Sequence, residues 1–580
     1  MAGSTEGRRV AGWEWWQPLA AGLAHALLAV LAFPPADIWI VAFAAPLPLI
    51  WAGCRTAERP LLGAVLVSIG VLPFWFFQER WLIEVTPAGY PALAVYLSLC
   101  TGFGVYLIAR IRRRATGVVP IPMFLLAPVA LGAVEVLRGE IVWTGYAWFL
   151  TGHPLIWAPT LAAPAAVFGS YFVSLLVLAL AGALADAAGW SGVARARGGQ
   201  AGAVVALVWV LTGWIGWREG NDRAGGISLD VAVVQTNLPQ SNKMGWTIAE
   251  RQADMRRFTE LTRQAAAVRP PPDIILWPET MFPGISLSPE MLEAFDAAWS
   301  ANNPGMARAG ERHAFILMAQ DLLRLQTETG IPMIVGSIAM PRPVSIRSEK
   351  GQADLESGPQ HNSAFLIDAG SVRSERYDKV DLTPFGEVIP YVWRWPALQQ
   401  KVLSLGAAGM AFNLVPGDTP SVLPVPRGNV SPEAGTQVYA ATPICFEVTR
   451  SALCRWLVCD GSRLRASVIF NLSNDGWFGR FSGGREQHLQ AARWRCVELG
   501  VPMVRAANTG ISAAIDSRGR LLRQGPDGQE VSSGTDGVMS VRLLVNPDRP
   551  VTIFGRLGDI WAWGALIAAG IWWLWRLVRG

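Results

Sequence analysis

The stretch VYAATPICFEVTRSALCRWLV, residues 438–458, contains a buried strand, a change of direction and a helix. Its apolar residues are nearly continuous over Val438–Cys445, which predicts a strand covered on both faces. From Glu447 to Val458 the apolar residues recur with helical spacing, so the strand leads directly into a helix. This order is typical of layered α/β domains.

The same alternation extends over residues 226–550, which we predict to be one large domain. Pro341–Gln360 and Val415–Gly435 have the composition of exposed loops. The predicted strands are Leu229–Gln235, Asp273–Trp277, Pro332–Ile338, Ser363–Asp368, Val438–Cys445, Ala466–Asn471, Met503–Ala507, Ser512–Asp516 and Val538–Leu543. The predicted helices are Thr247–Val268, Glu311–Thr329, Glu447–Val458 and Gly484–Leu499.

The rest of the chain is apolar enough to enter a membrane. Of the 580 residues 51% are hydrophobic and only 16% charged, against about 25% charged in soluble domains. This composition excludes intrinsic disorder and a purely soluble protein. Residues 1–222 are predicted to form seven transmembrane helices and residues 556–577 an eighth. These spans are Gln17–Phe33, Asp37–Ala52, Leu61–Phe77, Ala88–Ala109, Val118–Leu137, Ala162–Ala185, Ala203–Trp217 and Leu557–Leu577.

The arginines indicate the orientation of these spans, because positive charge accumulates on the cytoplasmic side. With the N-terminus inside, the short outer loops contain only Arg80 and Arg138. The inner segments contain twelve arginines, which are Arg8, Arg9, Arg55, Arg59, Arg110, Arg112, Arg113, Arg114, Arg195, Arg197, Arg576 and Arg579. Both termini are therefore predicted to be cytoplasmic and residues 226–550 to lie outside. Glu135, Arg138, Glu140 and His153 fall near outer ends of spans, where they are either interfacial residues or a lipid head-group site.

Several classes of function are disfavoured. The net charge is +5, but the arginines lie between apolar runs instead of in one patch, so we expect no nucleic-acid partner. No cluster of histidines and cysteines has metal-ligand spacing and no glycine-rich loop suits a phosphate, so we expect neither metal nor cofactor. We expect His488 to be structural. Cys454 and Cys459 are either free or paired, although their spacing on a predicted helix suits a disulfide poorly.

Three positions near predicted strand ends carry side chains that are candidates for catalysis. Glu279 lies in Trp-Pro-Glu-Thr, and a carboxylate there can act as a general base. Lys379 ends Tyr-Asp-Lys and is followed by Glu387 in Pro-Phe-Gly-Glu. Cys445 lies at the strand-to-helix turn, where free N–H groups are expected to favour a thiolate. Each signal is weak alone, but the ordered combination of Glu, Lys and Cys is specific.

These residues resemble the Glu-Lys-Cys triad of the carbon–nitrogen hydrolase (nitrilase) superfamily, and most closely its membrane branch, the apolipoprotein N-acyltransferases. The resemblance covers essentially the whole chain, including the layout of eight spans with the α/β domain after the seventh. The motifs that carry it are VQTNLPQ (234–240), WPET (277–280), YDK (377–379), PFGE (384–387), CFE (445–447), NLSNDGWFG (471–479), QHLQ (487–490) and RAANTG (505–510).

The resemblance implies an αββα sandwich and a role for each site residue. Cys445 would be the nucleophile, Glu279 the general base and Lys379 the cation that stabilises the oxyanion. Glu387 would orient the lysine, and Glu447 would support the site beside the cysteine.

Further positions also compare with the family. Trp246 would correspond to its mobile gating tryptophan. Phe446 stands where the family commonly has tyrosine, so a hydrogen bond from that hydroxyl is lost. Asp381 stands where a histidine is usual.

The activity implied is transfer of a fatty acyl chain from a phospholipid, through a cysteine thioester, to the α-amine of the N-terminal S-diacylglyceryl cysteine of an apolipoprotein. This resemblance implies a monomer in the bacterial inner membrane with a periplasmic catalytic domain. Two alternatives are open: a membrane-anchored amidase or nitrilase acting on a small C–N substrate, and a non-enzymatic membrane scaffold with a nitrilase-like outer domain.

Overall fold

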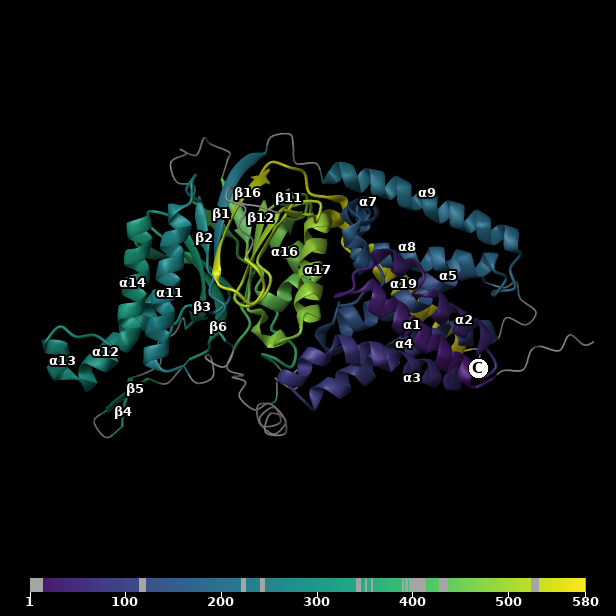
Figure 1. The fold of residues 1–580 in the computed structure, drawn as a ribbon, viewed down its shortest axis with the longest axis horizontal. Coiled ribbons are helices and arrows are strands. Elements are labelled where there is room, and N and C mark those ends of the chain that lie inside the picture. Colours follow the sequence, from purple (N-terminus) through teal and green to yellow (C-terminus); the bar gives the residue numbers. More distant parts are fainter. Residues whose placement is uncertain are drawn as a thin grey trace, which may run out of the picture.

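A computed structural model of the protein describes residues 14–113, 121–220, 226–239, 246–340, 346–349, 352–355, 358–388, 391, 395, 414–426, 437–522 and 531–578. In it an α/β body is joined to a bundle of long apolar helices (Figure 1).

The first sheet of the α/β body has six strands in the order β16-β1-β2-β3-β6-β7. Its first three strands in sequence are parallel, and β16, β6 and β7 pair antiparallel. The predicted strands of this sheet are confirmed, but β7 was missed because it is a polar edge strand with mostly exposed or half-buried side chains. The strands are β1 (Ile227–Gln235), β2 (Ile274–Leu276), β3 (Met333–Ala339), β6 (His361–Asp368), β7 (Ser371–Asp378) and β16 (Gly537–Val545).

The second sheet has the order β15-β14-β13-β12-β9-β8. The prediction that one strand continues to Cys445 is wrong, because β9 ends at Ala441 and only an isolated bridge joins Ile444 to Leu472. Pro443 lacks the N–H that a continued ladder needs. The strands are β8 (Leu423–Val425), β9 (Val438–Ala441), β12 (Val468–Ser473), β13 (Met503–Ala507), β14 (Ala513–Ile515) and β15 (Leu521–Leu522).

The two sheets face each other, and helices cover their outer faces. Along β1, Leu229 and Val231 enter the core between the sheets, and Ala232 and Val234 pack against the helices. Because both faces are buried, this strand reads as a continuous apolar run. In Figure 1, α11 (Ile248–Ala267) and α14 (Ala314–Thr329) flank the first sheet, and α16 (Ser451–Val458) and α17 (Ser482–Leu499) flank the second. The predicted αββα layering is therefore present.

The α/β body also contains shorter helices and strands outside the two six-stranded sheets and the helices that cover them. Within the predicted loop Pro341–Gln360, two strands form a hairpin, and β8 lies within the predicted loop Val415–Gly435. These additional elements are α12 (Pro289–Asn302), α13 (Pro304–Arg308), β4 (Ile346–Glu349), β5 (Gln352–Leu355), β10 (Cys459–Asp460), β11 (Arg463–Leu464) and α18 (Ile553–Leu557).

Helices occupy each of the eight predicted spans. Four described helices are long and apolar enough to cross a membrane: α3 (Pro60–Gln78), α4 (Gly89–Arg113), α8 (Ala165–Ala187) and α9 (Arg195–Glu219). The helices in the other spans do not meet this criterion over their described residues. The fifth span is interrupted by π-helical turns at Pro128–Gly132 and Leu137–Ile141. The helices in these other spans are α1 (Trp16–Ala32), α2 (Leu47–Arg55), α5 (Met123–Ala127), α6 (Ala133–Val136) and α19 (Ile560–Val578), with α7 (Pro159–Ala162) between spans.

Helix α17 joins the body to the bundle and lies between the second sheet and the apolar helices (Figure 1). Nearly all its residues are buried, including charged ones. Glu498 accepts a hydrogen bond of 2.8 Å from the backbone N–H of Ser170 on α8, and the Trp494 indole donates to the His153 carbonyl over 3.1 Å. These bonds satisfy polar groups that would be costly to bury unpaired, and they connect the α/β body to the bundle.

Arg138, one of the charged residues predicted near the outer ends of the spans, has partners within the protein. Arg138 is buried and donates to the carbonyls of Tyr146, Trp148 and Phe149 at 2.7–3.0 Å. It thereby organises the loop between the fifth and sixth spans.

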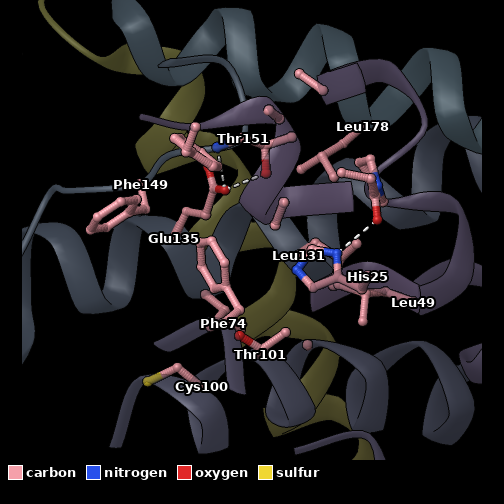
Figure 2. Close-up of a pocket in the computed structure, with 18 of the residues that line it drawn as sticks. His25, Leu49, Phe74, Cys100, Thr101, Leu131, Glu135, Phe149, Thr151 and Leu178 are labelled. Carbon is pink, nitrogen blue, oxygen red and sulfur yellow. Dashed lines mark hydrogen bonds between the residues drawn. The ribbon is translucent and has the colours of Figure 1, made fainter. Parts of the chain in front are cut away.

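A cavity of about 80 Å³ lies inside the bundle and is lined by His25, Phe74, Glu135 and Phe149 among others (Figure 2). Glu135 Oε1 accepts hydrogen bonds from the N–H and hydroxyl of Thr151, and its Oε2 has no hydrogen-bond partner among the described residues.

Candidate active site

Lys379 follows the last residue of β7 and is completely buried. Its Nζ lies 2.7 Å from Glu387 Oε2 and 3.8 Å from Glu279 Oε1, and it donates to the Thr383 hydroxyl at 3.2 Å. Burial alone would lower the pKa of Lys379, but the carboxylates of Glu387 and Glu279 raise it above its ordinary value. The ammonium therefore stays charged.

Glu279 lies just beyond β2 and is buried. The preceding Trp277 anchors this turn, because its ring stacks on Phe258 and its indole donates to Thr262 at 3.0 Å. The next residue, Thr280, has φ of +48°, a conformation that L-residues adopt rarely. Glu279 Oε2 accepts a 2.9 Å hydrogen bond from the backbone N–H of Asn474. A carboxylate is thus held in one orientation by a strained, well-packed turn.

Asn362 on β6 was missed by the sequence analysis. Its amide nitrogen donates to Glu279 Oε1 at 2.8 Å and lies 3.3 Å from Glu387 Oε1, so it bridges the two carboxylates. Its backbone carbonyl accepts from the Lys379 N–H at 2.8 Å. A single asparagine at a strand start is not a distinctive signal, and only the pairing of β6 with β7 reveals its place.

Cys445 begins a 3₁₀-helix, Cys445–Thr449, with φ of +52°. The expectation that the helix favours a thiolate is wrong. Burial, and then the negative charge of Glu279, raise the pKa of the Cys445 thiol above its ordinary value, and the opposing effect of Lys379 is smaller. The cysteine therefore rests as a neutral thiol within electrostatic range of an acid and an ammonium, and its reaction requires a base.

Glu447 connects the cysteine turn to the lysine segment. Its carboxylate accepts hydrogen bonds from the backbone N–H groups of Ile444, Val380 and Asp381 at 2.7–3.0 Å, and from the Tyr377 hydroxyl. Burial raises the pKa of Glu447 to about 7. One side chain thus holds the residues next to both Cys445 and Lys379.

Replacing Glu447 with glutamine should lower the free energy of unfolding by about 1–3 kcal/mol, because an amide nitrogen must then face a buried N–H that loses its acceptor. Chemical denaturation of the purified protein measures this change. Glu293→Gln, at an exposed position on α12, is the matched control. Equal stability of the two variants would show that the carboxylate does not join the segments.

The structure brings Glu279, Lys379, Glu387 and Cys445 together around one point, with Glu447 directly behind them. Phe446 is buried beside the cysteine. Asp381 forms an ion pair with Arg450 at 3.3 Å.

Trp246 lies at the start of α11, outside this group. Its indole donates to Asp254 at 2.7 Å, and the Arg251 guanidinium lies over its ring at 4.6 Å. Its gating role stays a prediction.

The six cysteines are all free, so the open question about Cys454 and Cys459 resolves to two buried thiols. Within the part of the chain that the structure describes, no group of three His, Cys, Asp or Glu side chains is placed to hold a metal ion.

Two family models match the chain, one in the α/β body and one in the apolar helices. Residues 230–535, more than half of the chain, match the carbon–nitrogen hydrolase family model. The chain therefore belongs to the carbon–nitrogen hydrolase family. Residues 25–183 match the model of the apolipoprotein N-acyltransferase N-terminal domain.

Similar curated proteins carry the name apolipoprotein N-acyltransferase. The protein of Geobacter metallireducens is 28% identical, covering 95% of this chain and 94% of its own. That of Rhodopseudomonas palustris is 27% identical, over 95% and 93%, and that of Vibrio vulnificus is 26% identical, over 96% and 97%. Among solved structures, an amidase from Nesterenkonia sp. aligns with a TM-score of 0.33 and 16% identity, over 55% of this chain and 91% of that one.

Proposed function

We propose that the protein transfers a fatty acyl chain from a phospholipid to the α-amino group of the N-terminal S-diacylglyceryl cysteine of an apolipoprotein. The observation that supports this most strongly is the joining of an acid–ammonium–thiol site to a bundle of apolar helices through the buried helix α17. A site built in this way serves a substrate that does not leave the bilayer.

In the first half-reaction, Cys445 attacks the ester carbonyl of the phospholipid and Glu279 takes the thiol proton. The carbonyl oxygen becomes an oxyanion, which Lys379 stabilises because it stays charged. The C–O bond then breaks, and the proton on Glu279 passes to the departing lysophospholipid alkoxide. The acyl group remains on Cys445 as a thioester.

In the second half-reaction, the α-amine of the lipoprotein attacks the thioester and Glu279 takes a proton from the attacking nitrogen. Lys379 again stabilises the oxyanion. The C–S bond breaks, the sulfur regains the proton, and an amide is released. Two steps through one thioester avoid the need to hold both lipids in the site together.

The membrane helices have an energetic role in this scheme. Moving a C16 chain from the bilayer into water costs on the order of 12 kcal/mol, at about 0.8 kcal/mol per CH₂. The thiol must therefore reach the membrane surface. The contact of α17 with the bundle supports this placement, because Cys445 lies one side chain away from a loop between two membrane helices.

We further propose that all eight helical segments cross the bacterial inner membrane, in domains of residues 1–222 and 556–577, with the domain of residues 226–550 in the periplasm. The arginine distribution supports this orientation. Reporters fused after Trp217 and after Gly580 should report opposite sides of the membrane. Identical signals from the two fusions would contradict the eight-span topology.

The test of function is incubation of the purified protein with a phospholipid that bears a tagged acyl chain. The tag should appear on Cys445 and be released by neutral hydroxylamine, which cleaves thioesters. Cys445→Ala should not label, and Cys454→Ala should label like the parent. Labelling of Cys445→Ala at the parent level would contradict the covalent mechanism.

The alternative is a membrane-anchored amidase or nitrilase, which the same site residues would serve. It gives no reason for several membrane helices where one anchor would suffice. An amidase would hydrolyse short amides without accepting the tag from a phospholipid, so the labelling experiment separates the two functions. A non-enzymatic scaffold would do neither.

A further inference from the structure

His488 on α17 is buried and contacts the backbone of the cysteine. Its Nε2 lies 3.1 Å from the carbonyl oxygen of Cys445. Trp148 covers one face of the imidazole, and the two rings stack with centroids 5.7 Å apart and planes 24° apart. The ring is therefore fixed between the membrane-side loop and the cysteine turn.

The neighbours of the two ring nitrogens determine which of them carries the proton. Nδ1 lies 3.0 Å from Arg505 Nη2, which is a donor only. It also lies 3.2 Å from Asp475 Oδ1, which pairs with Arg505 at 2.7 Å. Burial, and then the charge of Arg505, lower the pKa of His488, so the ring is neutral. The Cys445 carbonyl oxygen near Nε2 can only accept, which assigns the single ring proton to Nε2. Nδ1 then accepts from Arg505, which also pairs with Asp475.

That carbonyl belongs to a strained residue. Cys445 has a left-handed backbone, which L-residues other than glycine, asparagine and aspartate adopt rarely. A hydrogen bond to its carbonyl fixes the peptide between Cys445 and Phe446. Because the C=O and N–H of a trans peptide point in opposite directions, the same bond fixes the Phe446 N–H, which donates to no residue that the structure describes.

We propose that His488 is a positioning residue: its Nε2–H holds the strained peptide of Cys445, so that the thiol faces Glu279 and Lys379. For acyl transfer this inference rests on the proposed function. The inference about the reactivity of the thiol is independent of the proposed function, because a neutral thiol must be aligned with its base to react with any electrophile.

The test compares two substitutions at this position. His488→Phe keeps a flat ring against Trp148 and removes the donor, and His488→Gln places an amide N–H near the position of Nε2. The matched control is His313→Phe. His313 caps the N-terminus of α14, away from the site, and its ring also makes one hydrogen bond to a backbone group within an aromatic cluster. Two rates are measured: alkylation of Cys445 by chloroacetamide, located by peptide mass spectrometry, and acylation by tagged phospholipid at saturating donor.

We expect His488→Phe to slow both rates by about 10- to 100-fold, the loss of one well-placed hydrogen bond, with KM for the donor unchanged. His488→Gln should restore both rates to within about threefold of the parent. His313→Phe should match the parent. If the alkylation rates of the parent and the variants follow this pattern but the parent takes no acyl tag, the proposed function is wrong and the positioning role of His488 is retained.

Other results would overturn the inference. Alkylation of His488→Phe at the parent rate would show that the bond does not align the thiol. Equal slowing of the phenylalanine and glutamine variants would assign the effect to packing against Trp148. If His488→Phe does not fold, His488→Met is the donor-free variant. Failure of both to fold would assign the ring to folding and not to alignment.

Discussion

Replacing Lys379 with methionine should lower the rate of acyl-enzyme formation by about 10³-fold or more, because the oxyanion then loses its charged partner. Methionine has nearly the same length, so packing is preserved. The substitution also leaves the buried carboxylate of Glu387 unpaired, which should cost about 3–5 kcal/mol of stability. The rate is measured with the tagged phospholipid and the stability by chemical denaturation.

A double variant separates chemistry from stability. Adding Glu387→Gln to Lys379→Met removes the unpaired charge and should recover most of the lost stability without recovering activity. Arg324→Met, at an exposed position on α14, controls for loss of a cation. Acylation by the double variant at the parent rate would mean that another group stabilises the oxyanion.

Replacing Glu279 with glutamine should lower the rates of both half-reactions by about 10²–10⁴-fold. The glutamine oxygen can still accept the hydrogen bond from the Asn474 N–H, but its amide nitrogen then faces the Asn362 amide nitrogen. We therefore expect a loss of stability of about 1–3 kcal/mol, which chemical denaturation measures separately from the rate. The loss follows from the raised pKa of the Cys445 thiol, since a neutral thiol without its base attacks an ester slowly.

The pH dependence provides a second readout for this variant. Residual alkylation of Cys445 in Glu279→Gln should rise about tenfold per pH unit from pH 7 to 9, because the thiolate fraction follows hydroxide below the thiol pKa. The variant loses the charge of Glu279, but burial, which is the largest cause of the raised pKa of the Cys445 thiol, remains and keeps this range below the titration point. Glu290→Gln, exposed on α12, should behave like the parent. A plateau already at pH 7 would mean that the thiol is ionised without Glu279.

Most of the α/β architecture followed from local sequence. Strands such as β1 are continuous apolar runs because both faces are covered, and β1 leads into helix α11. The polar edge strand β7 was not predicted, because one covered face is not enough to create such a run. The eight apolar segments could also be predicted from the sequence. Four of the described helices are long and apolar enough to cross a membrane.

The sequence by itself determined the α/β layering, the apolar segments and the identity of the three chemical groups, because those depend on residue type and short-range periodicity. Only the tertiary structure decided the protonation of Cys445, the bridge made by Asn362 and the place of His488. The physical reason is that each depends on burial and on charges contributed by segments far apart in the chain. A thiol beside a helix start favours the anion locally, but desolvation and the carboxylate of Glu279 outweigh that effect once the sheets close around it.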